Sequence, residues 1–317
     1  MIEVVCLNPA MDRTLLIPDF ATGSINRSQD LVTVAGGKGL NAARFIKCLD
    51  PFQQVTVTGF VGGQTGNYIV DECVRLGIDE TFVRIQEATR VCVIVVERGR
   101  TTVINEDGPV VREDEVARFE ECLKDEECLK GRPHLAMICG SVPPGVPSSL
   151  YKDLVHSYKD RHVPVYLDAG GDALQQALDA IPTIVKVNEQ EFIGAVQGHK
   201  ICDEDELIFH ADQLIKKGTQ AVMITRGKEG SLVITKDDIA ILSFSSVTVI
   251  NSIACGDAYF AGVAVGMMQG RSIVASAVLG AAAATLKLGS FAPLLEGIER
   301  LAMYQEQIAV VHRKRGA

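Results

Sequence analysis

The sequence predicts an α/β protein: a doubly wound, mostly parallel sheet between two layers of helices, with a small β-sheet lid. From about residue 131 onward, apolar runs alternate with amphipathic stretches, which is typical of parallel strands covered by helices on both faces. The first third differs, because short β segments with turns interrupt this alternation. With 317 residues, 47% of them hydrophobic, the chain is long enough for one large domain of this kind.

The first third of the chain supplies the expected lid. Segment 2–7 is apolar and predicts a strand rather than a signal peptide. The lid segments lie at about 12–34 and 88–108, and the second contains a hairpin that turns near Arg98-Gly99. Because no linker rich in Pro, Gly or Ser separates them from the rest, we expect one domain over 1–317 with an inserted lid.

The remaining elements follow from the alternation of apolar runs and helical stretches. Expected strands are 135–139, 164–167, 183–187, 221–225 and 239–250, and expected helices are about 148–161, 171–180, 203–217, 256–268 and 272–288. In such sheets, ligands bind beyond the carboxyl ends of the strands. The residues that follow strands there are Asn8, Gly140, Asp168, Asn188, Arg226 and Asp257. We therefore expect the functional site at this edge of the sheet.

Charge and cysteine content exclude several classes of protein. The net charge is −9 and no basic face is visible, so we expect small-molecule partners and no nucleic acid. Segment 272–288 is too short and too weakly apolar to span a membrane, which favours a buried helix. The nine cysteines include no Cys-x-x-Cys pair, which favours reduced, buried thiols in a cytoplasmic protein. The six histidines lack metal-ligand spacing and are interpreted as structural or surface residues.

The stretch 251–262 places two small residues, a glycine and a carboxylate where a helix begins. A helix N-terminus presents unpaired N–H groups and a partial positive charge to an anion. Asp257 beside such an anion hole could deprotonate a hydroxyl while the N–H groups hold a phosphoryl group, as phosphoryl transfer to an alcohol requires. Taken alone, the stretch favours an ordinary helix start that Asp257 caps.

A second glycine-rich motif, Ala-Gly-Gly-Lys-Gly-Leu-Asn-Ala-Ala at 35–43, opens a helix that runs to about Leu49. It is neither a Walker A loop nor a dinucleotide fingerprint, because the required glycine spacings are absent. Its glycines would let the backbone approach a ligand, and Lys38 and Asn41 could then bond hydroxyls or phosphate oxygens. The alternative is a glycine turn before a helix, with Lys38 solvated.

The two motifs together resemble those of the ribokinase-like sugar kinases. The opening Leu-Asn-Pro-Ala-Met-Asp-Arg-Thr at 7–14 is similar to the phosphofructokinase B branch, which includes 1-phosphofructokinase and tagatose-6-phosphate kinase. The resemblance runs from residue 2 to about 290, with the motifs in the same order. It implies a ribokinase-like three-layer α/β/α fold. It also implies an ATP- and Mg²⁺-dependent kinase that phosphorylates a hydroxyl of a ketohexose phosphate.

The resemblance assigns a sugar-phosphate site beneath the lid. The residues implied are Asp12, Arg27, Gly36, Gly37, Lys38, Asn41, Arg90 and Ser141. Asp12 would bind sugar hydroxyls, and Arg27 and Arg90 would hold the phosphate that the substrate already carries, which suits the paired hydrogen bonds of arginine. Without the resemblance, the loop 140–145 around Ser141 would be an ordinary proline turn.

The resemblance also assigns a nucleotide site. The residues implied are Lys186, Asn188, Thr225, Arg226, Gly227, Gly230, Ala254 and Gly256. Apolar residues after Thr248 and the helix around 281–286 would enclose the adenine. Glu191 of the Asn-x-x-Glu motif would reach Mg²⁺ through water, in keeping with the reluctance of that ion to lose its waters. The same spacing fits a capping box between Asn188 and Glu191, and both interpretations can hold.

The catalytic group implied is Asp257 with Gly256, Cys255 and Ala254, and it departs from the family pattern of Gly-Ala-Gly-Asp or Gly-Ser-Gly-Asp. If position 254 requires a positive φ, the Ala254 Cβ would distort the anion hole and slow the enzyme. Cys255 lies at a helix N-terminus, where thiolates are favoured, so we expect sensitivity to oxidation or alkylation. The alternative is that Cys255 is a small buried residue.

Several alternatives stay open at this point. The sequence does not decide whether the acceptor is fructose 1-phosphate, tagatose 6-phosphate or fructose 6-phosphate. The altered Ala254-Cys255 pair suggests a non-catalytic sugar-phosphate binder instead. A nicotinamide-dependent oxidoreductase is disfavoured, because Leu7-Asn8-Pro9 stands where a glycine fingerprint is needed. The apolar strand 91–96 of the lid could pair by its edge across a homodimer, although a monomer is equally open.

Overall fold

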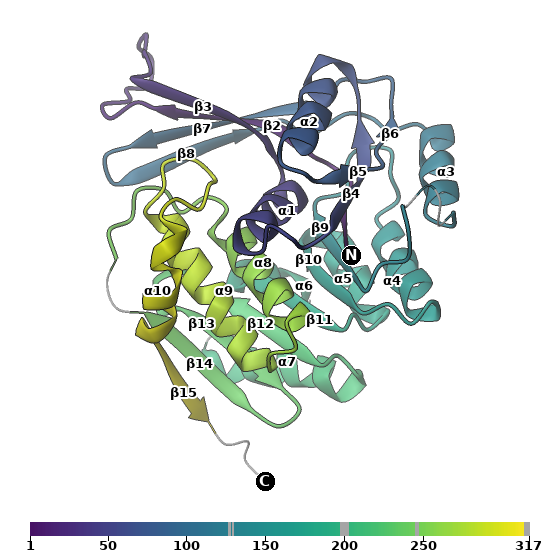
Figure 1. Cartoon of the computed structure of the whole chain (residues 1–317), viewed down its shortest axis with the longest axis vertical. Coiled ribbons are helices and arrows are strands. Elements are labelled where there is room, and N and C mark those ends of the chain that lie inside the picture. The colour runs from purple at the N-terminus through teal and green to yellow at the C-terminus, as the bar shows by residue number, and fades with distance from the viewer. Residues whose placement is uncertain (126–127, 129, 197–202, 245–246, 314–317) are drawn as a thin grey trace.

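The computed structural model describes residues 1–125, 128, 130–196, 203–244 and 247–313. Its main sheet places the N-terminal strand β1 (Ile2–Cys6) in the interior, between β9 (Leu135–Gly140) and β4 (Val55–Val61) (Figure 1). The strand order is β15 (Ile308–Arg313), β14 (Ile239–Phe244), β13 (Ser231–Thr235), β12 (Ala221–Thr225), β11 (Ile184–Asn188), β10 (Val165–Ala169), β9, β1, β4 and β5 (Asp79–Glu80), with β6 (Val83–Arg84) also paired to β4.

The central strands run parallel, and the sheet winds outward in two directions from β1. The chain pairs β1 with β4 on one side and with β9 on the other, both in parallel. Strands β13, β14 and β15 join in antiparallel fashion at one end. Ligands of such sheets bind where the winding direction changes, beyond the carboxyl ends of the strands. That point lies between β1 and β9, where Asn8 and Ser141 follow.

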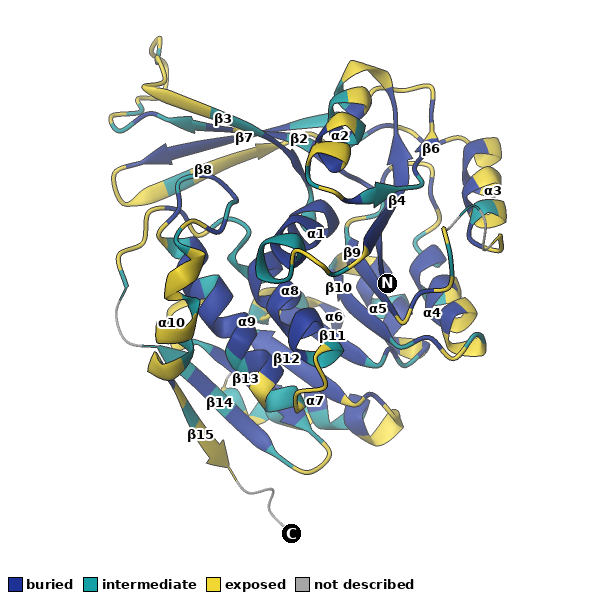
Figure 2. Cartoon of the chain, in the orientation of Figure 1, coloured by how far each residue is buried: buried dark blue, intermediate teal, exposed yellow. Residues whose placement is uncertain are grey.

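Two helical layers cover the sheet, because successive strand residues face opposite sides and both sides are apolar. Val4, for example, packs in one core cluster and Val5 in the other. One face carries α1 (Lys38–Leu49), α2 (Gly63–Arg75), α8 (Cys255–Met268), α9 (Ile273–Leu288) and α10 (Leu301–Gln307). The other carries α3 (Glu113–Cys122), α4 (Leu150–Asp160), α5 (Gly171–Asp179), α6 (Glu189–Ala195) and α7 (Glu204–Lys217). Figure 2 shows α8 and α9 mostly buried, whereas α10 is largely exposed.

A smaller sheet projects from the main body beyond α1 and has the strand order β3-β2-β7-β8 (Figure 1). Its strands are β2 (Ala10–Leu16), β3 (Asp30–Gly36), β7 (Arg90–Glu97) and β8 (Arg100–Asn105), which overlap the predicted segments 12–34 and 88–108. The β7–β8 hairpin turns at Arg98-Gly99, as predicted, with Gly99 at a φ of 78°. The interpretation of this sheet as a lid inserted into a single domain stays a prediction.

Two sequence predictions about strands are wrong. Strand β14 ends at Phe244 rather than at residue 250. The N–H groups of Ile250 and Asn251 bond the Leu288 carbonyl at the end of α9 instead of a neighbouring strand. Strand β7, which contains the apolar run 91–96, lies between β2 and β8 and has no free edge. A homodimer through the lid therefore stays a prediction that would have to use β3, β8 or a face of the small sheet.

The prediction of uniformly reduced thiols is also wrong. Cys122 and Cys128 form a disulfide, because the chain after α3 returns close enough for their Cα atoms to lie 5.5 Å apart. The free cysteines among the described residues are Cys6, Cys48, Cys73, Cys92, Cys139 and Cys255, and Cys202 lies outside them. Across the part of the chain that the structure describes, no helix has the length and apolar character needed to cross a bilayer.

Candidate active site

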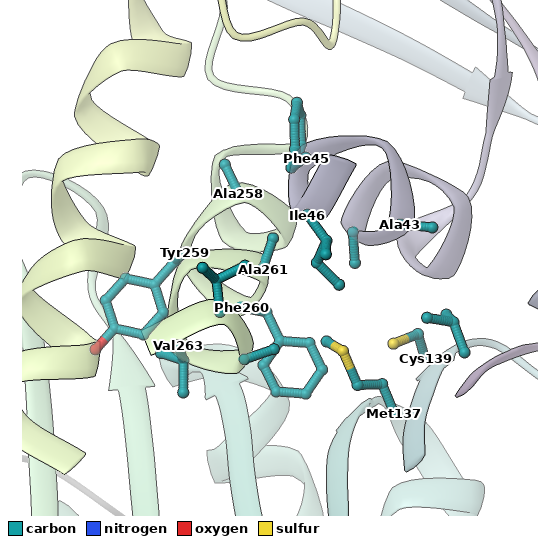
Figure 3. Packing of buried hydrophobic residues seen from close by; sticks show 14 of the residues in the cluster. Ala43, Phe45, Ile46, Met137, Cys139, Ala258, Tyr259, Phe260, Ala261 and Val263 are labelled. Carbon is teal, nitrogen blue, oxygen red and sulfur yellow. The ribbon is translucent and has the colours of Figure 1, made fainter. Parts of the chain in front are cut away.

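The contact between α1 and α8 builds the centre of the site. Small residues at the interface, among them Ala43, Ala258 and Ala261, are fully buried and let the two helices approach closely. Figure 3 shows Phe45 and Ile46 of α1 facing the α8 side chains, above Met137 of β9. This packing places the first turns of both helices next to each other at the carboxyl edge of the sheet.

Asp257 lies in the first turn of α8 and is only 7% exposed. The Asn41 amide on α1 donates a 2.9 Å hydrogen bond to Asp257 Oδ2, and Asn41 Oδ1 accepts one from Arg44. Burial raises the pKa of Asp257 to about 6, and the nearby Asp168 charge raises it further, while Lys186 opposes the shift. A carboxylate with a pKa just below neutral is well suited to accept a proton from a hydroxyl.

The glycine-rich motif makes room for a second carboxylate, that of Asp12. A Cβ on Gly36 would collide with the Asp12 carboxyl group, so glycine is required there. Gly37 has a φ of 94° and sits at the N-cap of α1. Burial raises the pKa of Asp12 to about 6, although Arg44 and Arg90 lower it. The predicted sugar-binding residues Asp12, Gly36, Gly37 and Asn41 therefore do gather at one place.

A chain of ion pairs crosses the floor of the site. Lys38 Nζ lies 2.7 Å from both Asp168 Oδ1 and Glu191 Oε1. Lys186 Nζ lies 2.6 Å from the other oxygen of Asp168. A Cβ placed on Gly256 would lie 2.7 Å from Lys186 Nζ, so this ammonium stands directly beside the start of α8. The predicted residues Lys38, Lys186 and Gly256 are thus connected through Asp168.

Electrostatics keep these paired groups charged. Burial alone would raise the pKa of Asp168, but Lys186 and Lys38 hold it below its usual value. Burial alone would lower the pKa of Lys38, but Asp168 and Glu191 raise it. Because both Lys38 partners are carboxylates, its ammonium is engaged by the protein in this structure, and the alternative of a solvated Lys38 is wrong.

Asn188 and Glu191 form the capping box that their spacing allowed. The Glu191 N–H donates to Asn188 Oδ1 at 2.8 Å, and the Asn188 N–H donates to Glu191 Oε2 at 3.0 Å. The described residues contain no group of three or more His, Cys, Asp or Glu side chains that could hold a metal ion. Any contact between Glu191 and Mg²⁺ therefore stays a prediction.

A cavity of about 490 Å³ opens beside the start of α8 and has the size of a small-molecule site. The predicted nucleotide residues Thr225, Gly227, Gly230 and Gly256 line it. Its apolar wall includes Val249, Ala281, Ala284 and Leu288, from the two segments where the adenine pocket was expected. Lys228 also lines the cavity and was not among the predicted residues.

Arg226 is placed differently from its predicted role. Its guanidinium lies 2.7 Å from Glu204 at the start of α7, and its side chain is only 8% exposed. The pair therefore braces the loop between β12 and β13 against α7. A direct contact between Arg226 and ATP stays a prediction without support from this geometry.

Ala254 and Cys255 are the two departures from the family pattern. Ala254 is the N-cap of α8 and has a φ of 66°, so this position does require the left-handed conformation that favours glycine. Cys255 lines the cavity, and burial raises the pKa of its thiol to about 11. The prediction of a reactive thiolate is therefore wrong, because burial outweighs the positive end of the helix.

Arg90 and Ser141 lie at the corner where the small sheet meets the main body. Arg90 donates to the carbonyls of Glu106 and Asn8, at 2.9 and 3.0 Å. The Asn8 amide donates to Ser141 Oγ at 3.1 Å. Arg27 is not brought to this corner. It lies in the exposed loop that joins the far ends of β2 and β3, so its role as a phosphate ligand stays a prediction.

Comparison with known proteins identifies the family. Residues 1–294 match the model of the pfkB family of carbohydrate kinases. The chain belongs to this family. The resemblance that the two glycine motifs suggested is thereby confirmed, and a nicotinamide-dependent oxidoreductase is excluded.

This pfkB kinase has curated relatives of similar length. It is 27% identical over 269 residues to 1-phosphofructokinase of Bacillus subtilis, with 85% of this chain and 86% of the relative covered. It is 28% identical over 271 residues to tagatose-6-phosphate kinase of Staphylococcus epidermidis, with 85% and 86% covered.

Solved structures confirm the ribokinase-like fold of this pfkB kinase. A Thermotoga maritima protein described as a possible 1-phosphofructokinase superposes with a TM-score of 0.90 at 24% identity, over 99% of this chain and all of that one. Ribokinase of the same organism superposes with a TM-score of 0.72 at 16% identity, over 96% and 99% of the two chains. Sequence reasoning thus identified both the fold and the family of this kinase.

Three buried residues of the kinase site were not assigned a role from sequence. Asp168 links Lys38 to Lys186, and its position directly after a parallel strand was the available signal. Arg44 orients Asn41 from three residues further along α1. Asn8 bonds both Ser141 and the Asp107 carbonyl, so it joins the loops after β1, β8 and β9.

Proposed function

We propose that this pfkB carbohydrate kinase transfers the γ-phosphoryl group of ATP to a hydroxyl of a ketohexose phosphate, fructose 1-phosphate or tagatose 6-phosphate. The observation that carries the proposal is the position of Asp257. Its carboxylate is bonded to Asn41 of the sugar-binding motif, while the preceding residue, Gly256, lines the nucleotide-sized cavity. One carboxylate therefore stands between the two sites that phosphoryl transfer must join.

The cavity supports ATP as the phosphoryl donor. Gly230 lines the cavity and has a φ of 82°. A Cβ there would collide with the Leu242 carbonyl, so this position of the cavity wall requires glycine. Lys228 at the rim and Lys186 beside Gly256 provide positive charge for phosphate groups. Mg²⁺ would enter as part of the substrate Mg-ATP and reach Glu191 only through water, because both Glu191 oxygens already accept protein hydrogen bonds.

The corner beneath the small sheet supports an acceptor that already carries a phosphate. The Arg90 guanidinium bonds the Asn8 carbonyl there, and the Asn8 amide in turn bonds the Ser141 hydroxyl. Guanidinium and hydroxyl groups bind phosphate oxygens, so Arg90 and Ser141 would hold the phosphate of the acceptor. Asp12 and Asn41 would bind the sugar hydroxyls. The names of the relatives, 1-phosphofructokinase and tagatose-6-phosphate kinase, support the same class of acceptor.

The proposed chemistry then follows. Asp257 accepts the proton of the acceptor hydroxyl while the hydroxyl oxygen attacks the γ-phosphorus. The bond between the γ-phosphorus and the β-phosphate oxygen breaks, and ADP leaves. The backbone N–H groups of Ala254, Gly256 and Asp257 at the start of α8 would stabilise the charge of the transferring group, whereas the Cys255 N–H donates to the Ser252 carbonyl at 3.3 Å in this structure. Lys186 adds a nearby positive charge.

A coupled ADP-release assay tests the proposal with Mg-ATP and each of three acceptors: fructose 1-phosphate, tagatose 6-phosphate and fructose 6-phosphate. We expect turnover with one of the first two, and a loss of about 10²–10⁴-fold in Asp257→Ala and in the near-isosteric Asp257→Asn. A preference for fructose 6-phosphate would show that the proposed acceptor is wrong. ATP binding without turnover on any of them would favour the non-catalytic binder.

A further inference from the structure

Lys287, in the last turn of α9, is a fully buried lysine that the proposed chemistry does not use. Its ammonium donates to the backbone carbonyls of Asn251, at 3.1 Å, and of Ser290, at 3.3 Å. Among the described residues, no carboxylate lies within ion-pair distance of it. Burial lowers the pKa of Lys287, and Cys255, Glu296 and Asp257 oppose this shift.

The carbonyls that accept hydrogen bonds from Lys287 belong to two segments that are hydrogen-bonded to each other beside the start of α8. The Asn251 amide donates to the Phe291 carbonyl at 2.8 Å, and Asn251 Oδ1 accepts from the Ile253 N–H at 3.0 Å. The Ile250 N–H donates to the Leu288 carbonyl at 2.8 Å. The segment that leads into α8 is thus tied to the segment that follows α9.

The packing of α8 on α9 explains why these segments meet. The helices lie side by side in antiparallel order, with Gly262 against Gly280 and Gly266 against Ser276 (Figure 1). The start of α8 therefore lies beside the end of α9, whose free carbonyls carry partial negative charge. Lys287, in the last turn of α9, bonds the Ser290 carbonyl just beyond the end of that helix and the Asn251 carbonyl in the loop before α8.

A purely structural role would not require an ammonium at this position. Burying a charge costs free energy that an apolar side chain of similar volume avoids, so a charge without a carboxylate partner calls for a local reason. The neighbouring loop provides that reason, because Ala254 there holds an unfavourable left-handed conformation that its surroundings must maintain.

We propose that Lys287 is a positioning residue, an internal cation that fixes the segment 251–254 so that the N–H groups at the start of α8 stay aimed at the transferring phosphoryl group. This inference rests on the proposed function of that helix start. Lys287 touches neither substrate, and it acts only through the Asn251 carbonyl and the loop that follows.

The first test compares Lys287→Met with wild type in steady-state kinetics. Methionine keeps most of the volume and removes the charge. We expect kcat to fall about 10- to 100-fold, because a small displacement of reacting groups has an effect of that order. We expect KM for both substrates to change less than about threefold, because the cavity walls remain. Lys159→Met is the matched control, since Lys159 also ends a helix and donates to two carbonyls, those of Ala180 and Ile181, away from the site.

Chemical rescue distinguishes a missing cation from general damage. Lys287→Ala would leave a space bordered by the Asn251 and Ser290 carbonyls and by the buried Ser290 hydroxyl, which has no partner within the described residues. We expect ammonium chloride or methylammonium chloride to restore kcat at least threefold, and tetramethylammonium chloride at equal ionic strength to have no effect. Equal responses to the three salts would overturn the proposal.

Hydrogen exchange measured by mass spectrometry keeps the test independent of turnover. We expect the amides of 250–258 to exchange at least tenfold faster in Lys287→Met than in wild type, with the β-strand peptides unchanged and no such effect in Lys159→Met. Unchanged exchange in 250–258, or a kcat equal to wild type, would contradict the role of Lys287. Absence of wild-type turnover on every sugar phosphate would count against the proposed function alone, and the exchange result would still decide the inference.

Discussion

At the residue scale, the helix start that carries Asp257 is bordered by a residue in an unfavourable conformation. Ala254 has a φ of 66°, in the left-handed region that favours glycine. The sequence suggested that a Cβ here would distort the anion hole. The structure shows instead that Ala254 adopts the left-handed conformation itself, so the substitution is expressed as backbone strain rather than as a different path of the chain.

Replacing Ala254 with glycine should therefore affect stability more than rate. We expect Ala254→Gly to raise the free energy of unfolding by up to about 1 kcal/mol, because the strain is relieved and is only partly offset by the greater freedom of glycine in the unfolded chain. We expect kcat to change less than about threefold, because the N–H groups keep their directions. Urea unfolding and the ADP-release assay measure the two quantities.

The matched control is Ala117→Gly, on the exposed side of α3. A glycine inside a right-handed helix lowers stability by about 1 kcal/mol, so the two substitutions should shift stability in opposite directions. A loss of stability in both variants would show that Ala254 is not strained.

The two buried carboxylates make the reaction sensitive to pH. The pKa values of Asp257 and Asp12 are each raised to about 6, mainly by burial. A protonated Asp257 cannot accept the hydroxyl proton, so kcat/KM should fall about fivefold between pH 6 and pH 5 from this group alone and level off above about 7. Initial rates from pH 5 to 8 test this. Sugar phosphates also titrate near pH 6, so the weak residual rate of Asp257→Asn provides the substrate's own profile.

At the element scale, one cluster of hydrogen bonds around Asn8 and Arg90 holds three chain segments that enter or leave the small sheet. Asn8 precedes β2, Arg90 begins β7, and Glu106 and Asp107 follow β8. The Asn8 amide bonds the Asp107 carbonyl at 2.9 Å, and Arg90 bonds the carbonyls of Asn8 and Glu106. Strands β2, β7 and β8 therefore share an attachment to the main body, next to Ser141 and the proposed phosphate position.

Removing the Asn8 side chain should loosen this attachment. We expect Asn8→Ala to lower the free energy of unfolding by about 1–3 kcal/mol, because a buried carbonyl loses its donor. We expect KM for the sugar phosphate to rise about tenfold with KM for ATP within twofold, because the cavity walls do not involve Asn8. Asn67→Ala on the exposed face of α2 is the control. Equal changes in both KM values would argue against a role specific to the small sheet.

At the scale of the whole molecule, the alternation of apolar runs was sufficient to predict a mostly parallel sheet between two helical layers, and strands β9 to β12 close to their observed bounds. Strands β4, β13 and β15 and helices α2, α3, α6 and α10 were not predicted. Asp257 and Asn41 were predictable because helix starts next to glycine-rich turns are informative without tertiary knowledge. The Arg226–Glu204 pair and the Lys287 cluster were not, because each depends on which distant backbone segments meet. The raised pKa of the Cys255 thiol was likewise not predictable, since a helix start indicates positive charge but not how far the surrounding protein desolvates the thiol.

The arrangement of the small sheet has a consequence for the order of folding. Its central pairing joins β2 in parallel to β7, so that Ala10 lies opposite Arg90, with α1, β4 and α2 between them in the chain. Before β7 has been synthesised, β2 and β3 can form only a two-stranded ribbon, which is marginally stable in water. During synthesis the small sheet can therefore be completed only after α1, β4 and α2 have been synthesised, and the nascent chain carries an unpaired β2 edge until then.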